Sequence, residues 1–334
     1  EKQYRRLSRE AIEDFGPVDL VVWPETVFFP PLEEFEDNLS PPKEWTGTVE
    51  QFESEIEFLT DRSRAPMARL AGELGSSLLL GVGTQRWTAD GAERLNSAAF
   101  VKRSGEFVGH YDKMQLVLFG EYVPFADRLP WIGSVLESLC VAATPGEAPM
   151  AFEVDGLRVS PNICYESVIP HLIRRQVNEL ARAGEEPDVL VNLTNDGWFW
   201  GSSELDMHLT CGVFRAIECR KPFLIAANTG FSAWIDGNGR IVEQGPRRAT
   251  GTILARPMPD DRGSWYLENG DWAAGICLLC CILLAIPGIL RRGIRRVRRM
   301  FTGDGKYSSN PSEAVRSDRI DAVYHGDSAA RPPD

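Results

Sequence analysis

The stretch VSPNICYES, residues 159–167, leads an apolar strand directly into a reactive side chain. The apolar run ends at Cys164, and a helix-like segment, residues 167–183, follows. A cysteine at a strand end just before a helix has backbone N–H groups nearby that can hold an oxyanion. Because free cysteines are often buried apolar residues, Cys164 on its own leaves a purely structural role open.

Two further strands end in charged residues. In DLVVWPET, residues 19–26, a β-branched run stops at Pro24, which cannot continue a ladder, so we expect Glu25 at a strand exit. In GHYDKM, residues 109–114, Lys113 follows two hairpin-like strands. Each charge alone is typical of a solvated loop, but the three strand exits together predict a site.

The rest of the chain alternates strand and helix patterns. Helices are expected over residues 49–74 and 204–220. The expected strands cover residues 78–82, 98–102, 106–110, 157–164, 189–193 and 223–227. No long Gly/Ser/Pro linker interrupts residues 19–243, and no solenoid-length repeat occurs. The pattern therefore predicts one α/β domain over residues 1–271.

Glu25, Lys113 and Cys164, in that order and 88 and 51 residues apart, resemble the catalytic triad of the nitrilase superfamily of carbon–nitrogen hydrolases. The motifs that carry the resemblance are WPET, YDKMQLVLFGEYVPF, NICYES, LTNDGWFW and AANTGFSAWID. Within the superfamily, residues 113–125 are most similar to the apolipoprotein N-acyltransferases. The resemblance covers roughly residues 19–239 and the apolar segment near the carboxyl terminus.

The resemblance implies a four-layer α-β-β-α sandwich in which Cys164 is the nucleophile. A thiol with a pKa of about 8.5 is mostly protonated at neutral pH, so its attack on a carbonyl needs a base, for which Glu25 is suited. Lys113 and the N–H of Tyr165 would stabilise the oxyanion. Glu121 and Glu166 are the expected supporting carboxylates beside Glu25.

Two loops are unusually apolar. Residues 114–131 read MQLVLFGEYVPFADRLPW and residues 197–201 read GWFWG. They either pack on the domain's own core or form a surface that meets a bilayer and receives acyl chains. The candidate substrate-binding side chains in these loops are Phe119, Tyr122, Trp198 and Phe199.

Charge is distributed unevenly along the chain. Residues 1–271 hold 42 acidic and 26 basic side chains, which argues against nucleic acid as a partner. Residues 272–290, WAAGICLLCCILLAIPGIL, carry no charge, and residues 291–299, RRGIRRVRR, contain six arginines. An apolar run of about 20 residues spans a bilayer, and flanking basic residues stay in the cytoplasm. The pattern predicts a transmembrane helix over residues 272–290.

This orientation places residues 1–271 on the extracytoplasmic side of the bacterial cytoplasmic membrane. Residues 291–334 are expected to be a basic and then disordered cytoplasmic tail, because they are rich in Ser, Asp, Gly, Arg and Pro. The chain starts directly in a charged helix-like stretch, EKQYRR, so we expect a fragment that lacks the membrane helices of the family.

Other chemistry finds little support in the sequence. The four histidines have no metal-ligand spacing and no glycine-rich phosphate loop occurs, so no metal or cofactor is implied. The seven cysteines allow no disulfide framework to be deduced, and Cys211 and Cys219 are expected in the core. His208 is expected to be structural. Asn195 and Asp196 either order the surroundings of Cys164 or form an ordinary turn.

The sequence thus predicts acyl transfer through a cysteine thioester beside a membrane. The resemblance implies a phospholipid as acyl donor and the amino-terminal diacylglyceryl-cysteine of a lipoprotein as acceptor. A membrane-tethered amidase would use the same residues with water as acceptor. A non-catalytic binding module is the second alternative.

Overall fold

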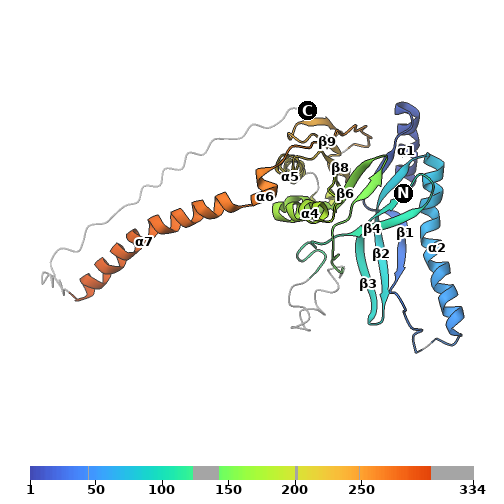
Figure 1. Ribbon diagram of the computed structural model, residues 1–334, viewed down its shortest axis with the longest axis horizontal. Coiled ribbons are helices and arrows are strands. Elements are labelled where there is room, and N and C mark those ends of the chain that lie inside the picture. The colour runs from blue at the N-terminus through green and yellow to red at the C-terminus, as the bar shows by residue number, and fades with distance from the viewer. Residues whose placement is uncertain (44, 123–142, 200–201, 248, 302–334) are drawn as a thin grey trace, which may run out of the picture. The chain divides into compact units, whose positions relative to one another are not determined.

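The computed structural model describes residues 1–301 except 44, 123–142, 200–201 and 248 (Figure 1). The chain divides into two units, Glu1–Asp271 and Trp272–Asp334. The first unit contains two β-sheets with helices, and the described part of the second is the single helix α7, Trp272–Phe301.

The two sheets have four and six strands. The first runs in the order β1 (Leu20–Phe35), β2 (Ser77–Thr88), β3 (Gly91–Val101) and β4 (Phe107–Asp112). The second runs in the order β10 (Ile241–Gln244), β9 (Ala233–Ile235), β8 (Phe223–Asn228), β7 (Val189–Asn195), β6 (Leu157–Ile163) and β5 (Phe152–Val154). The pairs β1–β2, β6–β7 and β7–β8 are parallel and the others are antiparallel.

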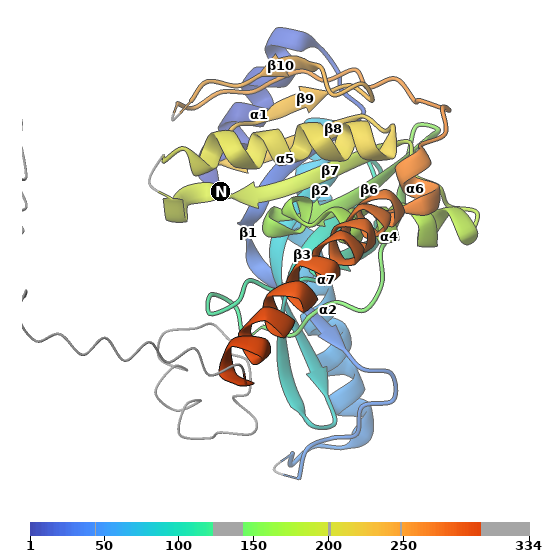
Figure 2. The ribbon, with the colours of Figure 1, turned by 90° about the vertical axis from the view of Figure 1, so that its left-hand side faces the viewer.

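Helices cover the outer face of each sheet, which confirms the predicted four-layer α-β-β-α sandwich. Helix α2 (Val49–Leu74), with α1 (Lys2–Phe15) beside it, lies against the first sheet (Figure 1). Helices α4 (Pro170–Arg182) and α5 (Glu204–Cys219) lie in front of the second sheet in Figure 2.

Three hydrophobic clusters fill the three spaces between these layers. Met67 and Leu70 of α2 pack on Trp23 of β1, and Ile173 of α4 packs with Phe223 of β8. Between the sheets, the cluster is formed by Leu79, Ala98, Phe100, Tyr111, Phe152, Val154, Val159, Ile163, Val189, Val191 and Leu193. Because each buried large apolar side chain stabilises the fold by about 1.5–3 kcal/mol, this middle layer fixes the two sheets against each other.

The predicted helix over residues 49–74 is confirmed as α2, and its ends have clear causes. Thr48 forms a capping box in which its side chain accepts from Gln51 N at 3.3 Å and its own N–H donates to Gln51 Oε1 at 2.9 Å. The helix ends at Gly75, whose left-handed φ of 62° suits a residue without a Cβ atom.

The prediction that the first strand ends at Pro24 was wrong. Strand β1 continues to Phe35, with a register shift between Trp23, which pairs with Leu80, and Phe28, which pairs with Val82. Pro24 has no N–H to donate, so the ladder breaks there but resumes beyond the irregular stretch. Glu25 therefore lies in a bulge rather than at a strand end.

Gly81 of β2 makes room for this bulge. A Cβ atom at Gly81 would collide with the carbonyl group of Pro24 and with the Cα atom of Glu25. A side chain at Gly81 would therefore push the backbone of Glu25 away from its present place.

The segment after Cys164 is not yet an α-helix, contrary to the predicted start at residue 167. Cys164–Val168 forms a 3-10 helix, η1, and α4 begins at Pro170. Proline favours the first position of a helix because its missing N–H would have no partner there and its φ is already helical.

Helix α7 is the one helix in the described part of the chain that is long and apolar enough to cross a membrane. The qualifying segment is Trp272–Arg295, which contains an 18-residue window with a mean hydropathy of 2.6. The helix continues through the first arginines to Phe301, beyond Leu290, where the sequence pattern ends the span. The end of α7 therefore does not coincide with the end of the uncharged sequence at Leu290.

Candidate active site

Cys164 lies immediately after β6, at the start of η1, as the sequence predicts. Its side chain is partly exposed, and its backbone has a φ of 50°, in the left-handed region that non-glycine residues rarely adopt. The carbonyl oxygen of Cys164 accepts hydrogen bonds from Asn192 Nδ2 at 3.2 Å and from Ser167 Oγ at 3.1 Å, and lies 3.2 Å from His208 Nε2. The thiol is thus carried on a closely held turn.

Glu25 is buried, with both carboxylate oxygens occupied. Oε1 accepts from Asn96 Nδ2 at 2.7 Å and from Lys113 Nζ at 3.2 Å, and Oε2 accepts from the N–H of Asn195 at 3.0 Å. The N–H of Asn195 comes from the end of β7, so both sheets hold this carboxylate.

Lys113 lies just after β4 and is only 1% exposed. Its ammonium group donates to Glu25 Oε1 at 3.2 Å and to Glu121 Oε1 at 2.8 Å, and the other oxygen of Glu121 accepts from the N–H of Val117 at 2.8 Å. The ammonium is therefore paired with two carboxylates. A buried charge needs such partners to offset its loss of hydration.

Gly146, between Lys113 and Cys164 in the sequence, holds the backbone of Lys113. The N–H of Gly146 donates to the carbonyl of Lys113 at 2.8 Å, and a Cβ atom at position 146 would collide with the carbonyl of Asp112. Only glycine allows this close approach, so Gly146 helps to fix the position of the ammonium group.

The electrostatic environment keeps the thiol protonated and the ammonium charged. Burial, and then the negative charge of Glu25, raises the pKa of Cys164 to about 12, although Lys113 acts in the opposite direction. Burial lowers the pKa of Lys113, but Glu25, Cys164 and Glu121 outweigh it and the net shift is upward. The thiol can therefore react at neutral pH only if a neighbouring base removes its proton.

Glu166 has a different place from the one predicted. In place of a contact with Glu25, its carboxylate accepts from Tyr111 Oη at 2.8 Å and from the N–H groups of Met114 at 2.7 Å, Gln115 at 3.0 Å and Ile163 at 2.7 Å. Burial raises the pKa of Glu166, and these donors oppose that shift. Glu166 joins the segment after Lys113 to the segment that carries Cys164.

The apolar loop after Lys113 divides between the core and the surface. Met114 packs against the cluster between the sheets and Leu116 is buried, whereas Leu118, Phe119 and Tyr122 are exposed. The described residues of this loop therefore include both core and surface positions, and contact of the surface positions with a bilayer stays a prediction. Residues 123–131 of the predicted loop lie outside the part of the chain that the structure describes.

Tyr165 and Phe199 are also exposed, at 42% each. Tyr165 is the second residue of η1, where backbone N–H groups have no partner within the helix. Trp198 belongs to the short 3-10 helix η2, Asp196–Phe199, but its side chain lies outside the described part of the structure.

The sequence did not point to three contributors to the site. Asn96 of β3 donates to Glu25, Asn192 of β7 donates to the Cys164 carbonyl, and His208 of α5 contacts the same carbonyl. Each lies at least 28 residues from its partner, so no local motif joins them. Asp196, considered as a residue that orders the nucleophile's surroundings, accepts from His208 Nδ1 at 2.9 Å.

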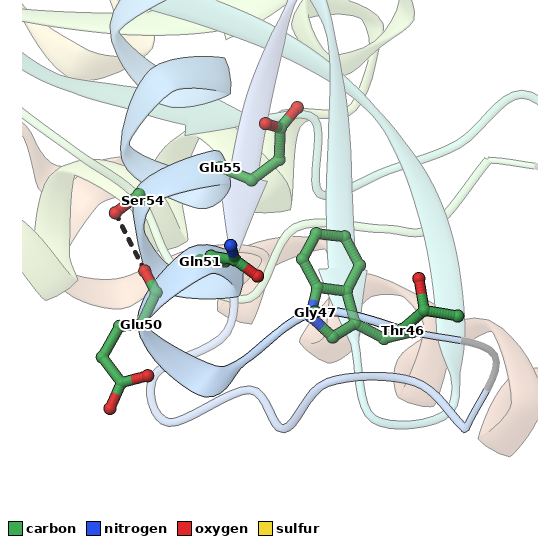
Figure 3. Close-up of a pocket in the computed structure, with 7 residues that line it drawn as sticks. Thr46, Gly47, Glu50, Gln51, Ser54 and Glu55 are labelled. Atoms are coloured by element: carbon green, nitrogen blue, oxygen red, sulfur yellow. Dashed lines mark hydrogen bonds between the residues drawn. The ribbon is translucent and has the colours of Figure 1, made fainter.

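Other features of the described residues do not form a second catalytic constellation. The described chain contains no group of three or more His, Cys, Asp or Glu residues arranged to hold a metal ion. The predicted core position holds for Cys219, which is buried, while Cys211 is partly exposed. An open hollow at the start of α2 is lined by Trp45, Thr46, Gly47, Glu50, Gln51, Ser54 and Glu55 (Figure 3). That hollow contains neither a thiol nor a lysine.

Comparison with known proteins identifies the family of the chain. A family model described as carbon-nitrogen hydrolase matches residues 2–266. The chain is 32% identical to an apolipoprotein N-acyltransferase of Rhodopirellula baltica, over 84% of this chain and 53% of the relative. It is 32% identical to that of Geobacter metallireducens, over 87% of this chain and 50% of the relative. The chain spans about half the length of these curated relatives.

Solved structures share the fold. An amidase from Nesterenkonia sp. superposes with a TM-score of 0.50 and 18% identity, covering 80% of this chain and 85% of that chain. Nit3 of Saccharomyces cerevisiae, a member of branch 10 of the nitrilase superfamily, gives a TM-score of 0.50 and 15% identity over 75% of this chain and 81% of that chain. At such identities the likeness concerns the fold alone.

Proposed function

Because the chain belongs to the carbon–nitrogen hydrolase family, we propose that it carries out the acyl transfer of an apolipoprotein N-acyltransferase, with Glu25, Lys113 and Cys164 as the catalytic residues. The observation that carries this proposal is the buried Glu25–Lys113 ion pair, whose two charges both act on the thiol of Cys164. Similarity to curated proteins of that name over more than four-fifths of the chain supports the choice of reaction.

In the first step, Glu25 takes the proton of Cys164 and the sulfur attacks the ester carbonyl of a phospholipid. Lys113, with the N–H of Tyr165, stabilises the oxyanion, and each such donor typically lowers the barrier by about 3–4 kcal/mol. The C–O bond of the ester then breaks, the leaving oxygen takes the proton from Glu25, and a lysophospholipid departs. The acyl chain remains on Cys164 as a thioester.

In the second step, the amino-terminal amine of a diacylglyceryl-cysteine attacks the thioester. Glu25 takes a proton from the attacking nitrogen, the C–S bond breaks, and the proton returns to the sulfur. The products are an amide and the free thiol, so the enzyme is restored. The exposed apolar residues Leu118, Phe119 and Tyr122 are suited to contact acyl chains.

The proposed membrane placement is supported by α7 and its arginines. The Trp272–Arg295 segment has the length and hydropathy of a span, and six arginines lie between residues 291 and 299. Because basic flanks stay in the cytoplasm, Glu1–Asp271 would lie on the extracytoplasmic side of the bacterial cytoplasmic membrane, beside both lipid substrates.

The test is a transfer assay with the full-length protein in phospholipid vesicles and a diacylglyceryl-cysteine peptide. We expect the peptide to gain one amide-linked acyl chain, and an otherwise identical peptide with an acetylated amine to gain none. Release of free fatty acid at the same rate with and without peptide would instead indicate a hydrolase. If the wild-type protein and the Cys164→Ala variant are equally inert, the chain is a binding module and the proposal fails.

A further inference from the structure

We propose that His208, held by Asp196, is a positioning residue that fixes the backbone of Cys164 in the conformation from which the thiol attacks. This inference rests on the proposed function, in which Cys164 is the nucleophile. It gives α5, which carries His208, a role in the reaction in addition to the roles of Glu25, Lys113 and Cys164.

His208 and Asp196 form a buried pair beneath the Cys164 turn. Both residues are less than 5% exposed. His208 Nδ1 lies 2.9 Å from Asp196 Oδ1, while Nε2 lies 3.2 Å from the carbonyl oxygen of Cys164 and 2.8 Å from Ser167 Oγ. The imidazole therefore bridges η2, which follows β7, and η1, which follows β6.

The hydrogen-bond partners determine where the protons lie. The Cys164 carbonyl can only accept, so Nε2 must carry a proton to bond with it, and the Asp196 carboxylate requires a proton on Nδ1. Ser167 Oγ donates its own proton to the Cys164 carbonyl and can accept from Nε2. The arrangement suits an imidazolium that donates from both nitrogens.

The charges around His208 favour this protonated form. Asp196 faces it from η2 and Glu204 lies one turn earlier on α5, while Arg215, further along α5, donates to the carbonyl of Ser167 at 3.1 Å. Burial lowers the pKa of His208, but the hydrogen bond and charge of Asp196 and the charge of Glu204 outweigh it, so the net shift is upward.

The turn needs such support because Cys164 has a φ of 50°. A residue with a Cβ atom adopts this region only where its surroundings hold it there. If the carbonyl lost its donors, the turn could relax and the sulfur would move relative to Glu25 and Lys113. A displacement of about 1 Å at a reacting atom can cost two orders of magnitude in rate.

Two substitutions of His208 separate positioning from simple packing. In His208→Gln, the amide nitrogen can reach the place of Nε2 and keep a donor on the Cys164 carbonyl. In His208→Asn, the shorter amide can replace Nδ1 beside Asp196 but leaves the Cys164 carbonyl without this donor. Both variants remove the imidazole ring, so a role in packing alone predicts similar losses.

The measurement is the rate at which iodoacetamide modifies Cys164 in the full-length protein, followed by peptide mass spectrometry. Cys211, one turn further along α5 and partly exposed, serves as the internal reference for an intact helix. We expect His208→Asn to slow modification of Cys164 about tenfold, the effect of losing a charge-assisted hydrogen bond. His208→Gln should stay within about threefold of the wild type, with the Cys211 rate unchanged in both.

Equal Cys164 rates in His208→Asn and the wild type would overturn the proposal, and so would equal losses in both variants. If His208→Asn does not fold, Asp196→Ala is compared with Asp196→Asn, because both remove the charge that raises the Cys164 pKa but only Asp196→Ala removes the acceptor for His208 Nδ1. Cys164 modification should be about threefold slower in Asp196→Ala than in Asp196→Asn, and equal rates would overturn the proposal. A wild-type protein that transfers no acyl chain would refute the proposed function, while the ratio of these modification rates would still test the positioning.

Discussion

The two sheets of the sandwich supply different parts of the site. The first sheet and its loops provide charge: the buried ammonium of Lys113 pairs with the buried carboxylate of Glu25 and with the partly exposed carboxylate of Glu121. The second sheet provides conformation, because Cys164 follows β6 and is held through its carbonyl by Asn192, Ser167 and His208. Under the proposed function, proton transfer would depend mainly on the first sheet and nucleophile geometry on the second, although Asn195 of β7 also donates to Glu25.

Glu166 connects the two parts. It lies in η1 beside Cys164, but three of its four hydrogen-bond donors, Tyr111, Met114 and Gln115, belong to β4 and the loop after it. A substitution of Glu166 should disturb both the charged groups around Lys113 and the turn that carries Cys164. A substitution within one sheet should mainly disturb one of the two.

The largest effect is expected for Cys164→Ala, which removes the one group that the second sheet presents for attack. Acyl transfer should fall by at least about 10⁴-fold, as for other removed nucleophiles. The melting temperature should change little because the lost side chain is small and partly exposed. Residual transfer close to the wild-type rate would show that the second sheet does not supply the nucleophile.

Charge substitutions in the first sheet should change the pKa of Cys164 without changing the fold. Glu25→Gln and Lys113→Met should each reduce acyl transfer about 10²- to 10³-fold. Their effects on the Cys164 pKa should be opposite, because the charge of Glu25 raises that pKa and the charge of Lys113 lowers it.

Iodoacetamide modification at alkaline pH measures this contrast. Cys164 should react faster than in the wild type in Glu25→Gln and more slowly in Lys113→Met. Shifts in the same direction would mean that the first sheet does not act on the thiol through charge.

Glu166→Gln should destabilise the connection between the two parts. An amide offers one acceptor oxygen where the buried carboxylate uses two, so at least one N–H or O–H donor loses its partner. We expect the free energy of unfolding in urea to fall by about 2–4 kcal/mol. The matched control is Glu121→Gln, whose side chain is 22% exposed and should cost only about 1 kcal/mol. Equal losses of unfolding free energy in the two variants would contradict a special role of Glu166 in connecting the two parts.

The smallest effect concerns a charge cluster on the first sheet, away from the thiol. His110 lies within 3.6 Å of Glu34 and 3.4 Å of Asp112, and these carboxylates outweigh burial and raise its pKa to about 9. A raised pKa stabilises the fold fully below the unfolded value of 6.5 and loses that contribution as the pH rises through about 9.

The free energy of unfolding of the wild type should therefore fall by about 1–3 kcal/mol across this interval. His110→Gln should flatten that dependence and leave the alkylation of Cys164 unchanged. An equally steep dependence in the variant would assign the titration to another group.

The sequence predicted best what is local. The helical pattern of α2 and the apolar run of β6 ending at Cys164 are visible in nearby letters, and both elements lie where expected. Pro24 was misinterpreted because a proline interrupts a ladder only locally, and Gly81 on the neighbouring strand, 57 residues away, lets the chain bulge and continue.

The remaining site contacts depend on the tertiary arrangement of the sheets. Asn96 reaches Glu25 across 71 residues of sequence and His208 reaches Cys164 across 44. Their residue types are equally common in ordinary packing, so only the register between strands and the position of α5 reveal them. The same applies to Glu166, whose place beside Cys164 was evident although its partners near Lys113 were not.

The most direct measurement is the intact mass of the full-length protein after incubation with phospholipid and no acceptor. If Cys164 is the nucleophile, a fraction of the protein should gain the mass of one acyl chain, and peptide mapping should place it on Cys164. Hydroxylamine should remove it because thioesters yield to that nucleophile, and addition of a diacylglyceryl-cysteine peptide should discharge it onto the peptide amine. Cys164→Ala should gain no mass. Acyl transfer by a wild-type protein that never carries an acyl chain on Cys164 would contradict the thioester mechanism.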